Sequence, residues 1–335
     1  MDQPIKAVVI GAGVTGLCAA HYLAKRFGHE NILVLESADH PGGTARTDLL
    51  DGYVLEWGPN GFLDKEPKTH EWIDELGLTA ELIRANEAAA HRFILRHGRL
   101  HEVQGPPKFL LSSLLSLSGR ARLLCEPFIP GKRDSTPESI WNFAARRIGR
   151  EAADTLVSPM VSGIFGGDAR QLSLEHCFPR MAAMERQYGG LYKALRAKRR
   201  ENPGASPMGP SGTLTCFPRG IQQLCDTAAA QLGDRLHCNA PVTSVRQDNT
   251  QFRIELNSGE ILLSEKLLVA APAYAAAQFL APLDGALAQT LGSVPYASIA
   301  VLCTAHGRSQ VAHPLNGFGF LAPRVEGVRT LGCLW

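Results

Sequence analysis

A chain of 335 residues that is 45% hydrophobic and 20% charged is long enough for one large or two medium domains and too apolar for intrinsic disorder. Its 34 basic and 32 acidic residues leave a net charge of +2, which argues against a nucleic-acid partner. The eight cysteines show no paired metal-ligand spacing, so we expect reduced thiols in the cytoplasm and no metal site. We expect neither a secretory signal nor a membrane-spanning helix, which would need about 20 apolar residues.

The N-terminal residues predict a nucleotide-binding turn. Residues 7–10 are apolar and mostly β-branched, as in a buried parallel strand, and residues 14–26 suit a helix. Between them runs Gly-x-Gly-x-x-Gly. Gly11 permits a tight turn, Gly13 lets a diphosphate approach the backbone, and Gly16 lets the helix pack closely on the strand. The unpaired amides and the positive dipole end of the helix favour an anion there.

Residues 32–35 predict a second buried strand, which ends at Glu36. A carboxylate about 20 residues past the last glycine is expected to accept hydrogen bonds from ribose hydroxyls. An ordinary strand–helix–strand unit with a Gly-rich turn is the alternative. The order of strand, glycines, helix, strand and acid favours the dinucleotide site over it.

A second Gly-rich turn contains Gly42 and Gly43, with Arg46 and Thr47 after it. Adjacent glycines and an arginine can bring amides and a positive charge to a second face of a diphosphate. A surface turn with a solvated arginine explains the same spacing equally well.

The middle of the chain predicts mainly helices, at residues 71–76 and 139–148, and one hairpin at residues 91–100. Arg92 on that hairpin is either a ligand-binding residue or an ordinary exposed strand position. Residues 108–122 predict an amphipathic helix with a basic rim. It could lie on an anionic membrane or present basic residues to solvent from a core-facing helix.

Two further stretches of the middle region are rich in glycine. Residues 161–168 predict a turn that either wraps a ligand or reverses the chain. Residues 197–212 are first basic and then rich in Pro, Gly and Ser, and they predict a flexible loop at an internal boundary.

The C-terminal third predicts one helix and several short strands. The helix spans residues 221–232, and the buried strand at residues 266–269 is expected to complete the nucleotide-binding sheet from a distant part of the sequence. Further strands are predicted at residues 235–238, 242–245, 252–256, 298–303, 317–321 and 328–335.

Several of these stretches together resemble the protoporphyrinogen oxidase family of flavin-dependent amine-oxidase-like proteins, along essentially the whole chain. The family-like motifs comprise the two glycine turns with Glu36, Glu56-Trp-Gly58-Pro59-Asn60, residues 161–168, Phe217 to Leu224, Pro241-Val242 and residues 317–321. Relatives in this family continue past the position of Trp335, so the resemblance implies a C-terminally truncated chain.

The resemblance implies FAD as cofactor and gives roles to individual residues. The residues implied to bind FAD are Gly11, Gly13, Gly16, Glu36, Gly42, Gly43, Arg46, Thr47, Gly58, Pro59 and Val242. Arg92 is implied to meet a propionate of the substrate, and Phe318, Gly319 and Leu321 to form an apolar wall, with Gly319 leaving room above the ring. No side-chain acid or base is assigned, since none of the eleven histidines lies in a catalytic pattern.

The implied fold is α/β: a discontinuous, Rossmann-like FAD-binding domain (1–65 and 215–275), a mixed-sheet substrate-binding domain (66–90 and 276–335) and a helical, membrane-associating insertion (91–214). The implied activity is oxidation of protoporphyrinogen IX to protoporphyrin IX. Six electrons leave in three hydride transfers to flavin N5, and dioxygen becomes hydrogen peroxide.

Two alternatives remain: oxidation of coproporphyrinogen III, and a non-catalytic carrier or inactive fragment. The implied partners are the porphyrinogen and dioxygen. A homodimer and a peripheral contact of this cytoplasmic protein with the membrane stay open.

Overall fold

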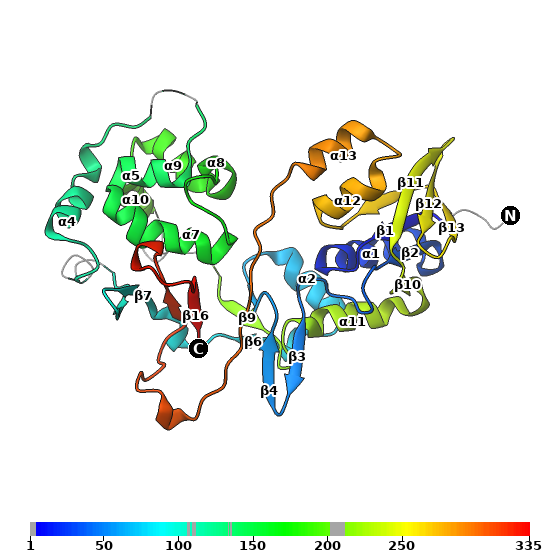
Figure 1. The fold of residues 1–335 in the computed structure, drawn as a ribbon, viewed down its shortest axis with the longest axis horizontal. Coiled ribbons are helices and arrows are strands. Elements are labelled where there is room, and N and C mark those ends of the chain that lie inside the picture. The colour runs from blue at the N-terminus through cyan, green and yellow to red at the C-terminus, as the bar shows by residue number, and fades with distance from the viewer. Residues whose placement is uncertain (1–4, 106–107, 109–111, 133, 135, 202–211) are drawn as a thin grey trace. The chain divides into compact units, whose positions relative to one another are not determined.

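The computed structural model describes residues 5–105, 108, 112–132, 134, 136–201 and 212–335. They form two compact units (Figure 1). The first comprises Met1–Ala85, Gly212–Tyr296 and Val301–Thr304, and the second comprises Asn86–Ser211, Ala297–Ala300 and Ala305–Trp335. The three-part domain division given above stays a prediction.

A four-stranded parallel sheet with the order β10-β2-β1-β14 forms the centre of the first unit. Its strands are β1 (Ala7–Ile10), β2 (Ile32–Leu35), β10 (Leu236–His237) and β14 (Leu267–Val269). β1 and β2 are buried along their whole length, because both faces of the sheet are covered. The prediction that a distant strand completes this sheet is confirmed, since β14 pairs with β1.

The two faces of the sheet pack against different elements. Ala7 and Val9 belong to one core with α1 (Val14–Phe27), α2 (Pro67–Glu75) and α11 (Gln222–Leu232). Val8 and Ile10 belong to a second core with the antiparallel sheet β11-β12-β13 and helix α12. These elements span β11 Val242–Asp248, β12 Gln251–Leu256, β13 Ile261–Ser264 and α12 Ala273–Leu280, and α13 (Gly285–Gly292) packs on α12.

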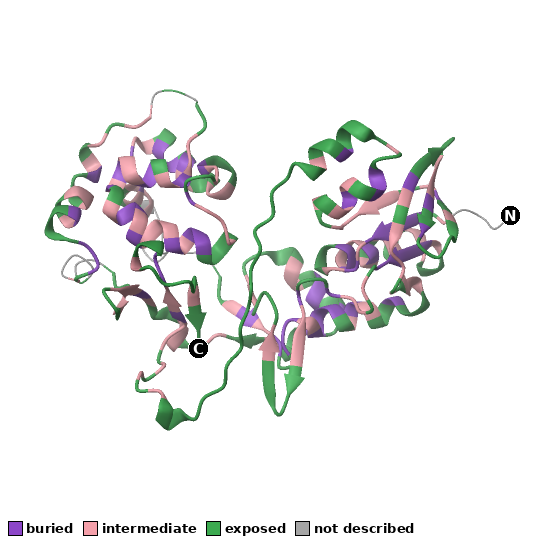
Figure 2. Cartoon of the chain, viewed as in Figure 1, coloured by how far each residue is buried: buried purple, intermediate pink, exposed green. Residues whose placement is uncertain are grey.

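Two small sheets complete the first unit. The hairpin β3 (Thr47–Leu50) and β4 (Tyr53–Glu56) turns at Asp51 and Gly52, which both have positive φ. Much of this hairpin is exposed (Figure 2). The other sheet has the order β5-β9-β6, with β5 Phe62–Leu63, β9 Leu214–Cys216 and β6 Ile83–Arg84. Short 3₁₀ turns lie at η1 His29–Asn31, η2 Thr79–Glu81 and η6 Gly233–Arg235.

The second unit combines one mixed sheet with a group of helices. The sheet has the order β16-β15-β7-β8, in which β15 and β7 are parallel and the outer pairs are antiparallel. Its strands are β7 (Arg92–Arg96), β8 (Arg99–Glu102), β15 (Gly319–Leu321) and β16 (Gly332–Leu334). The helices are α4 Leu117–Leu124, α5 Ile140–Ile148, α6 Arg150–Ala152, the π-helix η5 Ala153–Val157, α7 Ser158–Phe165, α8 Leu174–Cys177, α9 Pro179–Tyr188 and α10 Leu191–Glu201. Its 3₁₀ turns are η3 Glu87–Ala90, η4 Glu126–Phe128, η7 Arg308–Gln310 and η8 Arg324–Glu326.

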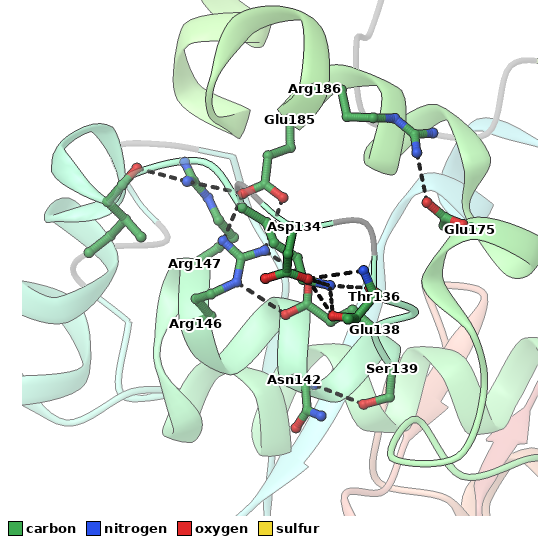
Figure 3. A network of polar contacts seen from close by, with 12 residues as sticks. Asp134, Thr136, Glu138, Ser139, Asn142, Arg146, Arg147, Glu175, Glu185 and Arg186 are labelled. Atoms are coloured by element: carbon green, nitrogen blue, oxygen red, sulfur yellow. Dashed lines mark hydrogen bonds and ion pairs between the residues drawn. The ribbon is translucent and has the colours of Figure 1, made fainter.

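Two neighbouring arginines of α5 tie the helices together through carboxylates (Figure 3). Arg146 donates to both Glu185 and Glu138 at 2.8 to 3.1 Å, and these hydrogen bonds raise its pKa. Arg147 is fully buried and donates from Nε to Glu126 Oε1 at 2.9 Å and from Nη1 to Glu185 Oε1 at 3.3 Å. Glu126 in turn accepts from the amides of Leu191 and Tyr192 at the start of α10. The network thus joins η4, α5, α9 and α10.

Two predicted elements are wrong. Most of residues 161–168 lie in α7, and only the end forms a turn, because Pro159 suits a helix start and Gly166 has the positive φ of a C-cap. Residues 298–303 form no strand in the described chain, although they are an apolar run rich in β-branched residues.

Two other predictions fall partly on undescribed residues. A helix was predicted for residues 108–122. Residues 109–111 of it, and residues 106–107 just before it, lie outside the described residues. Helix α4 starts at Leu117, because Ser116 caps it. Of the loop predicted for 197–212, residues 202–211 lie outside the described residues, and residues 197–201 are the end of α10.

Candidate functional site

The first glycine turn joins β1 to α1, and each of its glycines has a different surrounding. A Cβ added at Gly11 would lie 2.8 Å from the Ala270 carbonyl oxygen, and φ is +102° there. A Cβ at Gly16 would lie 1.8 Å from the Gly11 oxygen, so helix and strand pack in direct contact. A Cβ at Gly13 would meet no heavy atom of the described residues within 4 Å.

The start of α1 is suited to an anion. Its N-cap is Gly13, which has no side chain to bond the first amides, and the first turn carries no acidic residue. Val14 and Thr15 are exposed there. The open space at Gly13 therefore lies beside backbone donors and the positive end of the helix dipole.

Glu36 ends β2 and is buried beneath this turn. Its Oε2 accepts from the amide of Ala12 at 2.7 Å, and its Oε1 accepts from the amide of Ala38 at 2.8 Å and from Ser37 Oγ at 3.2 Å. The carboxylate thus fixes the glycine turn from within, and a second lone pair of Oε2 accepts from none of these groups. A cavity of about 550 Å³ lies next to the backbone partners of Glu36. It is lined by residues 236–241, 256–258 and Glu260. Val242 follows that lining segment as the first residue of β11.

The second glycine turn lies against the first. Gly42 forms a parallel bridge with Gly13 and donates its amide to Ala12 at 2.8 Å. A Cβ at Gly43 would lie 3.4 Å from the Gly13 Cα. Behind Gly42 lies Cys225, and burial raises the pKa of its thiol to about 12, so it is a neutral packing group. The two predicted glycine turns are therefore brought together.

Thr47 contacts the start of α11. Its hydroxyl donates to Glu56 Oε2 at 2.6 Å, its amide donates to Gln222 Oε1 at 2.8 Å, and Glu56 Oε1 accepts from the amide of Ile221. Gly220 has positive φ, and a Cβ there would overlap the Thr47 side chain. Thr47 thus holds the hairpin on α11 rather than facing a ligand with its hydroxyl.

Gly58 and Pro59 follow β4 and are exposed. A Cβ at Gly58 would lie 2.5 Å from the Thr44 carbonyl oxygen, so the segment runs close over the second glycine turn. Arg46, also predicted as a cofactor residue, lies over the indole of Trp57, with the guanidinium carbon 4.0 Å from the ring centroid. The nearby Gly58, Arg46 and Gly43 therefore border one exposed surface of the first unit.

The predicted substrate residues belong to the second unit. Arg92 is exposed on β7, and its guanidinium lies 5.8 Å from the Phe318 ring. Leu321 lies on β15 against α7, where a Cβ at Gly163 would lie 2.8 Å from its Cδ2. A Cβ at Gly319 would lie 2.1 Å from the Cys333 oxygen, so this glycine is required by its own sheet. The structure therefore gives no support to the idea that Gly319 leaves room for a ring.

Two other basic residues of the same hairpin already pair with carboxylates. His91 Nδ1 lies 2.5 Å from Glu102 Oε1, and this hydrogen bond is the main cause of the lowered pKa of Glu102. Arg96 Nη1 lies 2.9 Å from Glu326 Oε1. Arg92, in contrast, has no carboxylate partner among the described residues. Nowhere among the described residues do three side chains that could bind a metal ion lie together.

Several residues that shape the site were missed by sequence reasoning. Glu56, Gln222 and Gly220 form the contact of the hairpin with α11, and Asp48 pairs with Arg46. Gly220 and Glu56 lie in the family-like motifs named above, and these motifs are the signal from which their role could have been predicted. The Gln222 and Asp48 contacts join residues whose proximity only the fold reveals.

The comparisons with known proteins identify the family of this chain. A family model described as flavin containing amine oxidoreductase matches residues 14–329. The coproporphyrinogen III oxidase of Bacillus subtilis (strain 168) is 30% identical over 353 residues, which cover 100% of this chain and 73% of that protein. The chloroplastic protoporphyrinogen oxidase of Nicotiana tabacum is 29% identical and covers 99% of this chain and 63% of that protein.

Solved structures show the same fold. A crystal structure described as a protoporphyrinogen oxidase of Exiguobacterium sp. 255-15 matches with a TM-score of 0.77 and 23% identity, covering 100% of this chain and 73% of that one. The structure of putrescine oxidase bound to putrescine matches with a TM-score of 0.59 and 19% identity, and the match covers 83% of this chain and 60% of that one. The predicted mixed α/β fold and the predicted resemblance are confirmed.

Proposed function

Because the chain belongs to the family of flavin-containing amine oxidoreductases, we propose that it is an FAD-dependent oxidase that converts protoporphyrinogen IX to protoporphyrin IX. The observation that carries the cofactor assignment is the open space at Gly13, beside the free amides of α1 and above the buried Glu36. The names of two relatives that match nearly the whole chain, a coproporphyrinogen III oxidase and a protoporphyrinogen oxidase, support a porphyrinogen as substrate.

The residues of the first unit fit FAD. The α1 amides and the Gly42–Gly43 turn would hold the diphosphate, Glu36 would accept from the ribose, and Gly58 with Pro59 would border the flavin ring. Val242 at the edge of the 550 Å³ cavity would meet the adenine through its backbone. When bound, FAD accepts two electrons at a time, so loss of six electrons and six hydrogens takes three rounds and reduces three dioxygen molecules to hydrogen peroxide.

The chain's own contribution to the chemistry is binding, orientation and exclusion of water. Arg92 would bind a propionate of the substrate through its forked donors, which match two carboxylate oxygens. Phe318, whose ring lies beside the guanidinium, and Leu321 would supply apolar contact. We assign no side chain as acid or base.

Coproporphyrinogen III is the second candidate, since a coproporphyrinogen III oxidase is 30% identical to this chain. That substrate carries additional propionates and calls for additional free cations. His91 and Arg96, which flank Arg92 on the hairpin, are instead paired with Glu102 and Glu326. One free arginine in this group favours protoporphyrinogen.

The location proposed is the cytoplasm, with dioxygen as acceptor and a homodimer and a peripheral membrane contact as further proposals. All eight cysteines lie in the described chain as free thiols, which supports a reducing compartment. No helix of the described residues is long and apolar enough to cross a membrane. On α4, Leu117 and Leu124 are exposed, which supports a membrane contact, but Arg122 bonds the carbonyls of Arg146 and Arg147.

The test is to titrate the purified chain with FAD and then mix the complex, without oxygen, with protoporphyrinogen IX or coproporphyrinogen III. We expect a bound-flavin absorption spectrum that bleaches on addition of protoporphyrinogen and recovers with oxygen. Bleaching by coproporphyrinogen alone would favour the second candidate. A chain that binds FAD but bleaches with neither would contradict the proposed activity.

A further inference from the structure

Arg46, Asp48 and Trp57 form a closed set of contacts at the open end of the β3–β4 hairpin. The Arg46 guanidinium carbon lies 4.0 Å from the centroid of the indole, and its Nε lies 3.8 Å from Asp48 Oδ1. Trp57 Nε1 donates to Asp48 Oδ2 at 2.8 Å. The guanidinium is thus covered on one face by the ring and approached at its Nε edge by the carboxylate.

Strand geometry gives these three residues a common face. The Trp57 amide donates to the Arg46 carbonyl at 2.9 Å, so the two residues are opposite each other. Side chains alternate along paired strands, and the intervening Thr47 and Glu56 face α11. The arginine cannot turn toward α11 without breaking that alternation.

The terminal nitrogens of Arg46 remain available. Within the described chain the guanidinium has no partner besides Asp48 and Trp57, and 37% of the Arg46 side chain is exposed. Asp48 is 3.8 Å away, beyond hydrogen-bonding distance, so two Nη groups keep their donors. Three positions before Arg46 is Gly43, which lies against Gly13 at the start of α1.

We propose that Trp57 and Asp48 are positioning residues that hold the Arg46 guanidinium toward the diphosphate of the bound cofactor. This inference rests on the proposed FAD site. Trp57 fixes the plane of the guanidinium by stacking, and Asp48 fixes the indole by accepting from Nε1 and attracts the guanidinium by its charge. An arginine that is already ordered loses less rotamer freedom when it binds an anion.

The proposal is tested by measuring the dissociation constants of FAD, ADP and riboflavin for five variants by calorimetry. Trp57→Leu removes the ring face and should weaken FAD and ADP binding about two- to fivefold, the usual effect of an exposed cation–π contact. Riboflavin, which lacks the diphosphate, should bind unchanged. Arg46→Ala should weaken FAD binding about tenfold or more. Trp57→Phe keeps a ring face and should restore most of the affinity.

The decisive measurement is the double variant Arg46→Ala with Trp57→Leu. If Trp57 acts only through Arg46, adding Trp57→Leu to Arg46→Ala should leave the FAD affinity unchanged. Tyr53→Leu, another exposed aromatic of the same hairpin, is the matched control and should have no effect.

Each other outcome overturns the proposal in a distinguishable way. An equal loss from Trp57→Leu with and without Arg46 would mean that Trp57 acts directly or through the fold. A loss of riboflavin affinity would place the effect at the flavin. A wild-type chain that binds FAD and bleaches with porphyrinogen, yet shows no effect of Trp57→Leu, would leave the proposed function standing and remove this inference alone. No FAD binding by the wild type would remove both.

Discussion

Gly13 and Gly16 lie three residues apart in one turn but are required for different physical reasons. Gly16 lies against the Gly11 carbonyl, whereas Gly13 faces open space and has an ordinary φ of −69°. Gly13→Ala should therefore change the free energy of unfolding by no more than about 0.5 kcal/mol. FAD binding should weaken about fivefold or more, because the methyl group takes the place of the diphosphate.

Gly16→Ala is the matched comparison. Overpacking of helix against strand should destabilise the chain by about 1–3 kcal/mol even without FAD. Thermal unfolding of the cofactor-free variants, followed by FAD titration, measures both effects. Equal FAD affinity of Gly13→Ala and wild type would contradict the assigned site.

Arg92 gives a second prediction at the residue scale. Arg92→Ala should weaken substrate binding by about 1–3 kcal/mol, the usual contribution of a charged hydrogen bond, and should leave FAD binding unchanged because Arg92 belongs to the other unit. The Michaelis constant for protoporphyrinogen measures it. Arg99→Ala, on the neighbouring strand, is the control, and an equal effect of both variants would argue against a specific propionate contact.

At the scale of elements, the buried Arg147 determines how four helical segments pack. Replacing Arg147 by Met leaves Glu126 buried without its cation, which typically costs about 3–5 kcal/mol, whereas Glu185 keeps its bonds to Arg146. Arg186→Met breaks an exposed pair with Glu175 and should cost less than about 1 kcal/mol. Hydrogen exchange of the α5 and α9 amides compares the two variants, and similar protection in both would show that the network is not essential to packing.

Glu126 predicts how this part of the molecule responds to acid. Burial alone would raise its pKa, but the hydrogen bonds from Arg147, Tyr192 and Leu191 outweigh burial and hold the pKa below the ordinary value of a glutamate. A carboxyl with a lowered pKa in the folded state stabilises that state fully above the unfolded value. The contribution is lost as the pH falls through the folded pKa. Protection of α10 amides should therefore fall below about pH 4.5, and it should fall less steeply in Glu126→Gln.

The helices and strands that could be predicted from the sequence are those whose ends carry a local signal. β1, β2, α1 and α5 were predicted within a residue or two, because glycines, a serine cap and uniform apolar runs mark their ends. Residues 161–168 were mistaken for a turn, since their glycines outweighed the helix start at Pro159. The strand predicted at residues 298–303 has an apolar run but no neighbouring strand in the described chain, and pairing is a property of the fold.

At the scale of the molecule, every residue assigned to FAD belongs to the first unit. A ligand opposes every unfolding event that destroys its site, by about 2.7 kcal/mol at a hundredfold excess over the dissociation constant, and does not oppose openings that leave the site intact. Saturating FAD should therefore slow hydrogen exchange in β1, α1 and β14 and leave α5 and α9 unchanged. Equal slowing in the second unit would show that its helices also bind the cofactor or fold together with its site.

The residues of the candidate site could be predicted where their spacing along the sequence forms a known motif. They could not be predicted where the site depends on contacts between residues far apart in the sequence. Gly13 and Glu36 were found from their positions along the sequence, and the structure brings them together through Ala12. The set of Arg46, Asp48 and Trp57 depends on the pairing of two strands, so the sequence alone predicted the arginine without its neighbours.

The strand order of the parallel sheet affects how the chain is made. Val8 of β1 pairs with Leu267 of β14, so during translation the first strand leaves the ribosome long before its neighbour is synthesised. At about 5–20 residues per second, the growing chain carries an unpaired, fully apolar strand edge for on the order of tens of seconds. Gly11 packs on Ala270, just beyond β14, so a nascent chain completes the surroundings of its first glycine turn only late in its synthesis and has to be kept from aggregating until then.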